Sequence, residues 1–171
     1  MARGGDSGAL RVLAWPGQGA RAKNPYTWLL YTHLAALGVE VRDFTPERVL
    51  RGGYDLLHVH WPEKAMTAPS RVGRAGGALA AIALLEVAHR RGARIVWTAH
   101  NARPHEARDG WLDQWYWDEV VRRVDGVIHP SGAGRAVVEA RYPALARRPA
   151  DVVWLGHFRA TYPDRVTKQE A

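Results

Sequence analysis

The chain has 171 residues, a length that fits one domain with a hydrophobic core of its own. It contains no cysteine, which excludes disulfides, thiolate metal sites and cysteine nucleophiles. Hydrophobic residues make up 47% and charged residues 24%, as in folded globular domains, and the net charge is +7 with neutral histidines.

Strands and helices alternate along the chain. In chain order, the pattern predicts a strand over 10–15, a helix over 25–37, a strand over 39–44, a helical turn at 45–46, a strand over 54–60, a helix over 76–91, a strand over 93–98, a helix over 111–124, a strand over 127–129, a helix over 131–142 and a strand over 151–155. Asn24-Pro25 is typical of a helix start and Gly38 of a helix end.

This alternation predicts the fold class. Without internal repeats, it indicates an α/β fold: a single Rossmann-like, doubly wound parallel sheet of about six strands with helices on both faces. On the helix over 111–124, Trp111 and Trp115 share a face, so we expect them in the core and Tyr116 or Trp117 at the surface.

The sequence indicates neither a nucleic-acid-binding protein nor a membrane-spanning protein. The pairs Arg90-Arg91, Arg122-Arg123 and Arg147-Arg148 are interpreted as solvated helix ends, so we expect no nucleic-acid partner. The N-terminus lacks the apolar core of a signal peptide, and the longest apolar stretch, 77–88, is too short to span a bilayer. We expect a cytoplasmic protein, with peripheral membrane contact through its positive charge as the alternative.

In such a sheet, ligands bind beyond the carboxyl ends of the strands. Five of the eight histidines fall at or just beyond predicted strand ends, together with small and polar residues. The set comprises Gly17 and Gly19, His58 and His60, His100 and Asn101, His129 and Ser131, and His157.

The first of these loops, residues 17–22, fits a relaxed G-x-G-x-x-A pattern, and Asp43 near the end of the second strand stands where a ribose is held in dinucleotide sites. The helix starts too late for that fingerprint. We interpret Gly17 and Gly19 as a turn that approaches a phosphate or sugar closely, with a plain surface loop as the alternative.

His58 and His60 lie two apart on a strand and therefore share a face. A metal hydrolase presents two ligands in this way, and His100, His105 and Glu106 are available as further ligands. The simpler alternative is that these are core histidines whose ring nitrogens are hydrogen-bonded within the protein. The segment 98–106 concentrates imidazole, amide and carboxylate groups, which suit hydrogen bonding to hydroxyls and proton transfer.

Four segments together carry a resemblance to a family. His58-Val-His-Trp-Pro-Glu63, Trp97-Thr-Ala-His100-Asn101 with Pro104-His105-Glu106, Pro130-Ser131, and Gly156-His157-Phe-Arg159 with Tyr162-Pro163 resemble the N-terminal domain of retaining GT-B glycosyltransferases of the family-4 type. The resemblance covers residues 11–163.

The resemblance implies a role for each segment. His100 would be the catalytic histidine, and Gly17 and Gly19 would approach the donor diphosphate. Ser131, which we also expect to cap the following helix, and His157 would line the cleft between two domains. The acceptor would be bound by His58, His60, Trp61, Asn101, His105 and Glu106.

The resemblance also implies partners and boundaries. The partners would be a nucleotide-sugar donor, held mostly by a C-terminal domain, and a sugar or lipid-linked acceptor, with no metal and no cofactor. Residues 1–163 would form the N-terminal domain and 164–171 the start of a linker, so we expect the chain alone to transfer no sugar. The alternatives are a metal-dependent hydrolase using His58, His60 and His100, and a non-catalytic nucleotide-binding module.

Overall fold

The computed structural model describes residues 8–21, 25–101, 110–158 and 161. The elements alternate as the sequence predicts. In chain order they are β1 (Arg11–Trp15), η1 (Gln18–Ala20), α1 (Pro25–Ala36), β2 (Glu40–Asp43), α2 (Pro46–Arg51), β3 (Leu56–Val59), η2 (Pro62–Met66), α3 (Arg71–Arg90), β4 (Arg94–Thr98), α4 (Gly110–Arg123), β5 (Gly126–His129), α5 (Gly132–Arg141), η3 (Pro143–Arg147) and β6 (Ala150–Val152).

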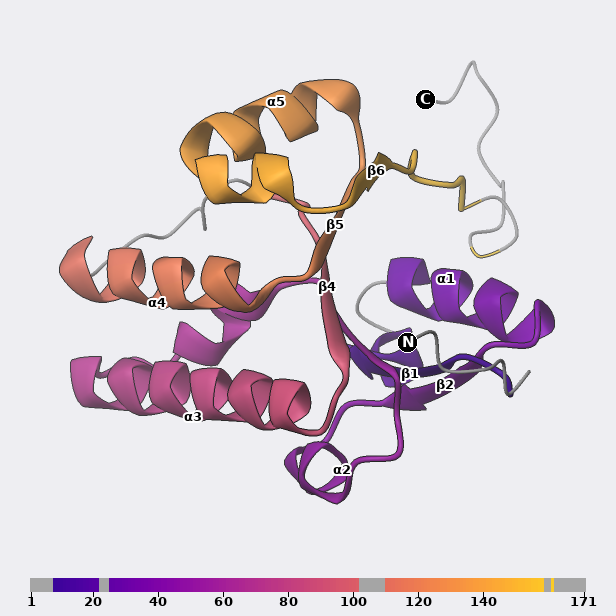
Figure 1. The fold of residues 1–171 in the computed structure, drawn as a ribbon, viewed down its shortest axis with the longest axis horizontal. Coiled ribbons are helices and arrows are strands. Elements are labelled where there is room, and N and C mark those ends of the chain that lie inside the picture. Colours follow the sequence, from indigo (N-terminus) through magenta and orange to yellow (C-terminus); the bar gives the residue numbers. More distant parts are fainter. Residues whose placement is uncertain (1–7, 22–24, 102–109, 159–160, 162–171) are drawn as a thin grey trace, which may run out of the picture.

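The strands form one six-stranded parallel sheet in the order β2-β1-β3-β4-β5-β6. Helix α1 lies on one face, and α3 and α4 lie on the other (Figure 1). The predicted α/β, Rossmann-like fold is therefore confirmed. Because the chain leaves β1 toward one edge and β3 toward the other, the strand order reverses between them, and this is where such sheets bind ligands.

Side-chain caps set several helix boundaries. Ser131 caps α5, as predicted, by accepting a hydrogen bond from the Gly134 amide at 3.0 Å. Ser70 caps α3 in the same way through Gly73, so this helix begins five residues before the predicted start at Gly76. Glycines in its first turns hid this start in the sequence. The predicted cap Asn24 lies outside the described residues.

Helix α3 has 20 residues and is long and apolar enough, by length and composition, to cross a membrane. It is longer than the apolar stretch from which the sequence argued against a span. One side of this helix is nevertheless built into the domain. Ala78, Ala81, Ile82, Leu85 and Ala88 are buried in the main hydrophobic core.

The rings of the aromatic helix α4 are buried differently from the prediction, except for Trp115. Tyr116 and Trp117 are buried, at 0% and 3% exposed, whereas Trp111 is 65% exposed. Trp117 packs beside Trp97 of β4 and stacks on Tyr142. Trp115 is partly buried against the core. The expectation for Trp111 was wrong because the buried face of α4 runs through Leu112, Tyr116 and Val120, and Trp111 lies outside that face.

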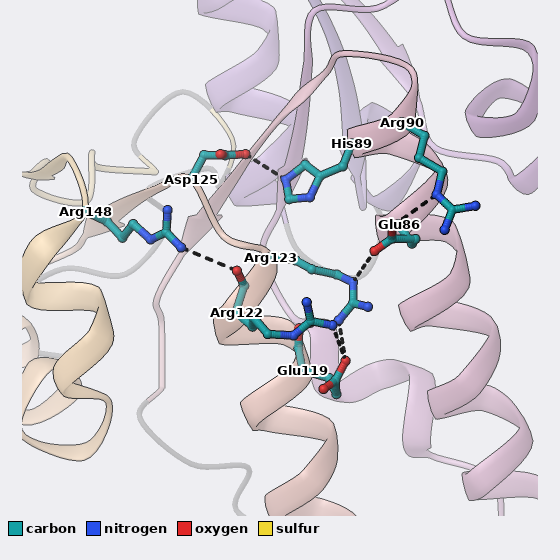
Figure 2. A network of polar contacts seen from close by, with 8 residues as sticks. All are labelled: Glu86, His89, Arg90, Glu119, Arg122, Arg123, Asp125 and Arg148. Carbon is teal, nitrogen blue, oxygen red and sulfur yellow. Dashed lines mark hydrogen bonds and ion pairs between the residues drawn. The ribbon is translucent and has the colours of Figure 1, made fainter.

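The arginines at the end of α4 also differ from each other (Figure 2). Arg123 is 7% exposed and donates to Glu119 at 2.5 Å and to Glu86 of α3 at 3.2 Å. It is therefore an ion-paired bridge between α3 and α4 rather than a solvated end. Arg122 is exposed and pairs with Glu119 at 2.8 Å.

Candidate functional site

His58 of β3, His60 directly after this strand and His100 after β4 come together at the carboxyl ends of the central strands. Nδ1 of His60 lies 3.1 Å from Nε2 of His100. The rings of His58 and His60 have their centroids 4.3 Å apart, so both project from the same face of β3 as predicted. The site is thus assembled at the point where the strand order reverses.

Tyr31 of α1 connects the two imidazoles. Its hydroxyl lies 3.0 Å from Nδ1 of His58 and 2.7 Å from Nε2 of His60. Nε2 of His58 lies 2.8 Å from the hydroxyl of Thr98 in β4. Tyr31 is not among the site residues predicted from the sequence. The signal available in the sequence was a tyrosine in the helix that precedes the histidine-bearing strand, since its hydroxyl could bond to the imidazoles.

His100 stands at the rim of this cluster and is half-buried. The ring of Trp61 stacks on it at a centroid distance of 4.7 Å and an interplanar angle of 16°. Tyr26 of α1 meets His100 edge-on at 5.1 Å. The ammonium of Lys64 lies 4.4 Å from the centre of the Trp61 ring. Aromatic rings therefore fix the plane of His100 from two directions.

The cluster is uncharged near neutral pH. Burial lowers the pKa of His58 to about 4, with a smaller contribution from His100. Burial and then the charge of Lys64 lower the pKa of His100 to about 4. The pKa of His60 is lowered in the same direction, first by burial and then by its two histidine neighbours. Neutral imidazoles donate and accept one hydrogen bond each, which suits contact with hydroxyl groups.

This arrangement does not favour a metal centre. Both ring nitrogens of His58 and of His60 already face a hydroxyl or another imidazole. Within the described ranges, no group of three or more His, Asp or Glu side chains is placed to hold a metal ion. His105 and Glu106, which the hydrolase alternative also considered, lie outside the described residues.

The loop after β1 is closed by a carboxylate. Asp43, the last residue of β2, accepts hydrogen bonds from the backbone N–H groups of Gln18 at 2.8 Å and Gly19 at 3.0 Å. A Cβ on Gly17 would lie 2.1 Å from Oδ1 of Asp43. The amides of Gln18 and Gly19, in the turn predicted to approach a phosphate or sugar, are thus satisfied within the chain, and Gly17 is needed for the close approach of Asp43.

An apolar groove of about 280 Å³ opens on the α1 face of the sheet beside the histidines. Leu30 and Leu34 of α1 form one wall, and Val96 and Ile128 of the sheet form another. His58 and Thr98 also line it, so the groove adjoins the polar cluster.

The other predicted site residues are less closely connected. Asn101 is half-buried directly after His100, and His157 is exposed after β6. Ser131 is engaged in its cap. His129 is fully buried at the end of β5, and neither ring nitrogen has a hydrogen-bond partner in the described part of the chain. The structure therefore brings together His58, His60, Trp61 and His100, and His157 does not take part in their contacts.

Two curated relatives are similar to part of this chain. Both are GDP-mannose:glycolipid 4-beta-D-mannosyltransferases from Xanthomonas campestris pv. campestris, one of them from strain ATCC 33913. Each is 38% identical over 104 residues, which cover 58% of this chain and 29% of the relative. The chain thus matches less than a third of the length of these relatives. The similarity supports the glycosyltransferase expectation.

No family model matches the chain. Among solved structures, a PfkB family carbohydrate kinase from Listeria grayi DSM 20601 aligns with 80% of this chain and 55% of its own. Its sequence identity is 12% and its TM-score 0.37, values too low to support any functional argument.

Proposed function

We propose that this chain is the acceptor-side, N-terminal domain of a GT-B glycosyltransferase that moves a sugar from a nucleotide-sugar donor to an acceptor hydroxyl. The observation that carries the proposal is the half-buried His100, held by Trp61, Tyr26 and His60 beyond the carboxyl ends of the central strands. The similarity to two mannosyltransferases over 104 residues supports the same reaction class.

In this proposal, His100 is the catalytic residue that meets the transferred sugar and the acceptor. A neutral imidazole there hydrogen-bonds to a hydroxyl without the repulsion that a charged one would meet beside Lys64. Trp61 offers an aromatic ring next to it, and Asn101 adds an amide one residue further on. His58 and His60 are 5% and 1% exposed, which favours support of His100 over direct contact with the acceptor.

A lipid-linked sugar is the proposed acceptor, and GDP-mannose is the first donor to test, because the relatives act on these compounds according to their names. The apolar groove beside His58 and Thr98 is chemically suited to the hydrocarbon part of such an acceptor. Peripheral membrane contact belongs to the same proposal. Donor binding would fall mostly to a second domain, with Gly17 and Gly19 near the diphosphate.

The stereochemistry of transfer is a separate part of the proposal. The resemblance to family-4 enzymes implies retention, which would turn an α-linked donor sugar into an α-linked product. The relatives' name specifies a β linkage. The anomeric configuration of the product, read by NMR, therefore tests the retaining mechanism independently of sugar transfer itself.

The experiment uses the complete protein, which by this proposal joins this chain to a second domain. It is assayed with GDP-mannose and a lipid-linked saccharide, and with UDP-glucose as the control donor. We expect mannose to be transferred to the lipid-linked acceptor. We expect the 171-residue chain alone to give no turnover. Failure of the complete protein with every nucleotide sugar tested would overturn the proposed function.

A further inference from the structure

Five side chains form a continuous hydrogen-bonded chain from the core to the site. The order is Thr98, His58, Tyr31, His60 and His100, with successive distances of 2.8, 3.0, 2.7 and 3.1 Å between the bonded atoms. The first four side chains come from residues between 0% and 5% exposed. Buried polar groups of this kind need both their donors and their acceptors satisfied.

The proton positions in this chain are linked. Each neutral imidazole has one N–H and one bare nitrogen, and the Tyr31 hydroxyl donates once. If one member of the chain turns its proton around, its neighbours must do the same. An arrangement in which Tyr31 accepts from both imidazoles would leave its own buried hydroxyl proton without an acceptor among these contacts. Two arrangements use the Tyr31 proton within these contacts: all protons directed from Thr98 toward His100, or all directed from His100 toward Thr98.

The inner end distinguishes the two arrangements. Among the described residues, the hydrogen-bond partner of the Thr98 hydroxyl is Nε2 of His58. If His58 donated to Thr98, the hydroxyl proton of Thr98 would need another acceptor in the buried interior. If Thr98 donates to His58, its hydroxyl proton forms one of the hydrogen bonds described above. Satisfaction of the buried hydroxyl therefore favours the outward direction.

The distances are consistent with the same direction. Hydroxyl donors make shorter hydrogen bonds than N–H donors. The contact from Tyr31 to His60 is 2.7 Å, as for a donating hydroxyl, and the contact between Tyr31 and His58 is 3.0 Å, as for a donating N–H. The contact from Thr98 to His58 is 2.8 Å. His60 then donates from Nδ1 to Nε2 of His100 at 3.1 Å.

We propose that Thr98, His58, Tyr31 and His60 form a one-way hydrogen-bond chain that fixes His100 in its Nδ1–H tautomer, with Tyr31 as the central positioning residue. Nε2 of His100 is then occupied as an acceptor, and Nδ1–H is the group left to a ligand. His100 therefore meets a hydroxyl or phosphate oxygen as a hydrogen-bond donor. His100 acts as a base only if every proton in the hydrogen-bond chain is redirected from His100 toward Thr98.

The tautomer of His100 can be tested whether or not the protein transfers a sugar. Only the catalytic role that we assign to this tautomer rests on the proposed function. Imidazole ¹³Cδ2 and ¹⁵N chemical shifts distinguish the two neutral tautomers, and the experiment records them at neutral pH for histidine-labelled protein. The eight histidines are assigned by single His→Gln variants. We expect His58, His60 and His100 all to show the Nδ1–H form, although neutral imidazole in water prefers the proton on Nε2.

Tyr31→Phe removes the central hydroxyl and keeps the ring. Nε2 of His60 then loses its donor, and we expect His60 and His100 to shift toward the Nε2–H form. The matched control is Tyr54→Phe, which removes a buried hydroxyl that donates to the Val49 carbonyl at 3.4 Å in another part of the core. The control should leave the shifts of His100 unchanged.

Thr98→Val is the second variant, in case Tyr31→Phe does not fold. It removes the proton at the inner end, and we expect the His58 signals to move toward the Nε2–H form. An Nε2–H tautomer of His100 in the unsubstituted protein would overturn the proposal. So would unchanged histidine shifts in a folded Tyr31→Phe or Thr98→Val variant. If the tautomers are as expected and the complete protein transfers no sugar, the hydrogen-bond chain stands and the proposed function falls.

Discussion

Nε2 of His58 lies 2.8 Å from the hydroxyl oxygen of Thr98, a contact that joins β3 to β4 directly beneath the candidate site. His58 is only 5% exposed, so a proton added to it would place a charge in the core. The same contact network holds His100 at the rim. The stability of the domain and the state of its candidate catalytic residue therefore depend on the same buried side chains.

The first prediction concerns pH. The pKa of His58 is about 4 in the folded protein because of burial, against 6.5 for the free side chain. Between these values the unfolded chain binds a proton that the folded chain does not, so stability falls as the pH drops through this window. His58 contributes a slope of up to about 1.4 kcal/mol per pH unit. Urea unfolding of His58→Gln should show a slope shallower by up to this amount; equal slopes would contradict it.

The second prediction concerns the loop after β1. In Gly17→Ala, the new Cβ would lie 2.1 Å from the Asp43 carboxylate, which must move and release the amides of Gln18 and Gly19. We expect a loss of about 1–3 kcal/mol in the free energy of unfolding. The control is Gly132→Ala, where nothing lies within 4 Å of the added methyl group. Equal stability of the two variants would show that the hydrogen bonds from Gln18 and Gly19 to Asp43 are dispensable.

Two neighbouring glycines of α3 give the third prediction. A Cβ on Gly77 would lie 2.0 Å from the Ala65 carbonyl oxygen, whereas one on Gly76 meets nothing within 4 Å. Gly76→Ala should stabilise the protein by up to about 1 kcal/mol through helix propensity. Gly77→Ala should destabilise it and push α3 away from η2, the turn that follows Trp61. Thermal unfolding of the pair measures this difference, and a matching gain in both variants would refute it.

The sequence predicts the fold well because strand and helix periodicities depend on which face each residue buries. Helix starts were harder to predict, since Ser70 caps α3 ahead of a glycine-rich turn that resembles a loop. The exposure of Trp111 and the burial of Trp117 and Arg123 depend on how α4 sits on its neighbours. That placement is a tertiary property, and residue spacing along one helix does not determine it.

The site was partly predictable for a similar reason. Residues at the carboxyl ends of parallel strands meet in any such sheet, so His58, His60 and His100 could be grouped in advance. Tyr31 comes from the helix that covers them, and only the packing of α1 against β3 shows its contact with both rings. The use of the Gln18 and Gly19 amides by Asp43 is likewise a product of strand pairing between β1 and β2.

The proposed mannose transfer, assayed in the complete protein carrying His100→Ala, tests the account most directly. His33→Ala is the matched control, because His33 is exposed on α1 and its Nδ1 pairs with the Leu29 carbonyl. We predict a fall in turnover of about 10²–10⁴-fold for His100→Ala, as for the loss of a group that exchanges or shares a proton at the reacting atoms. The control should retain full activity. Undiminished turnover in a folded His100→Ala variant would contradict the central claim.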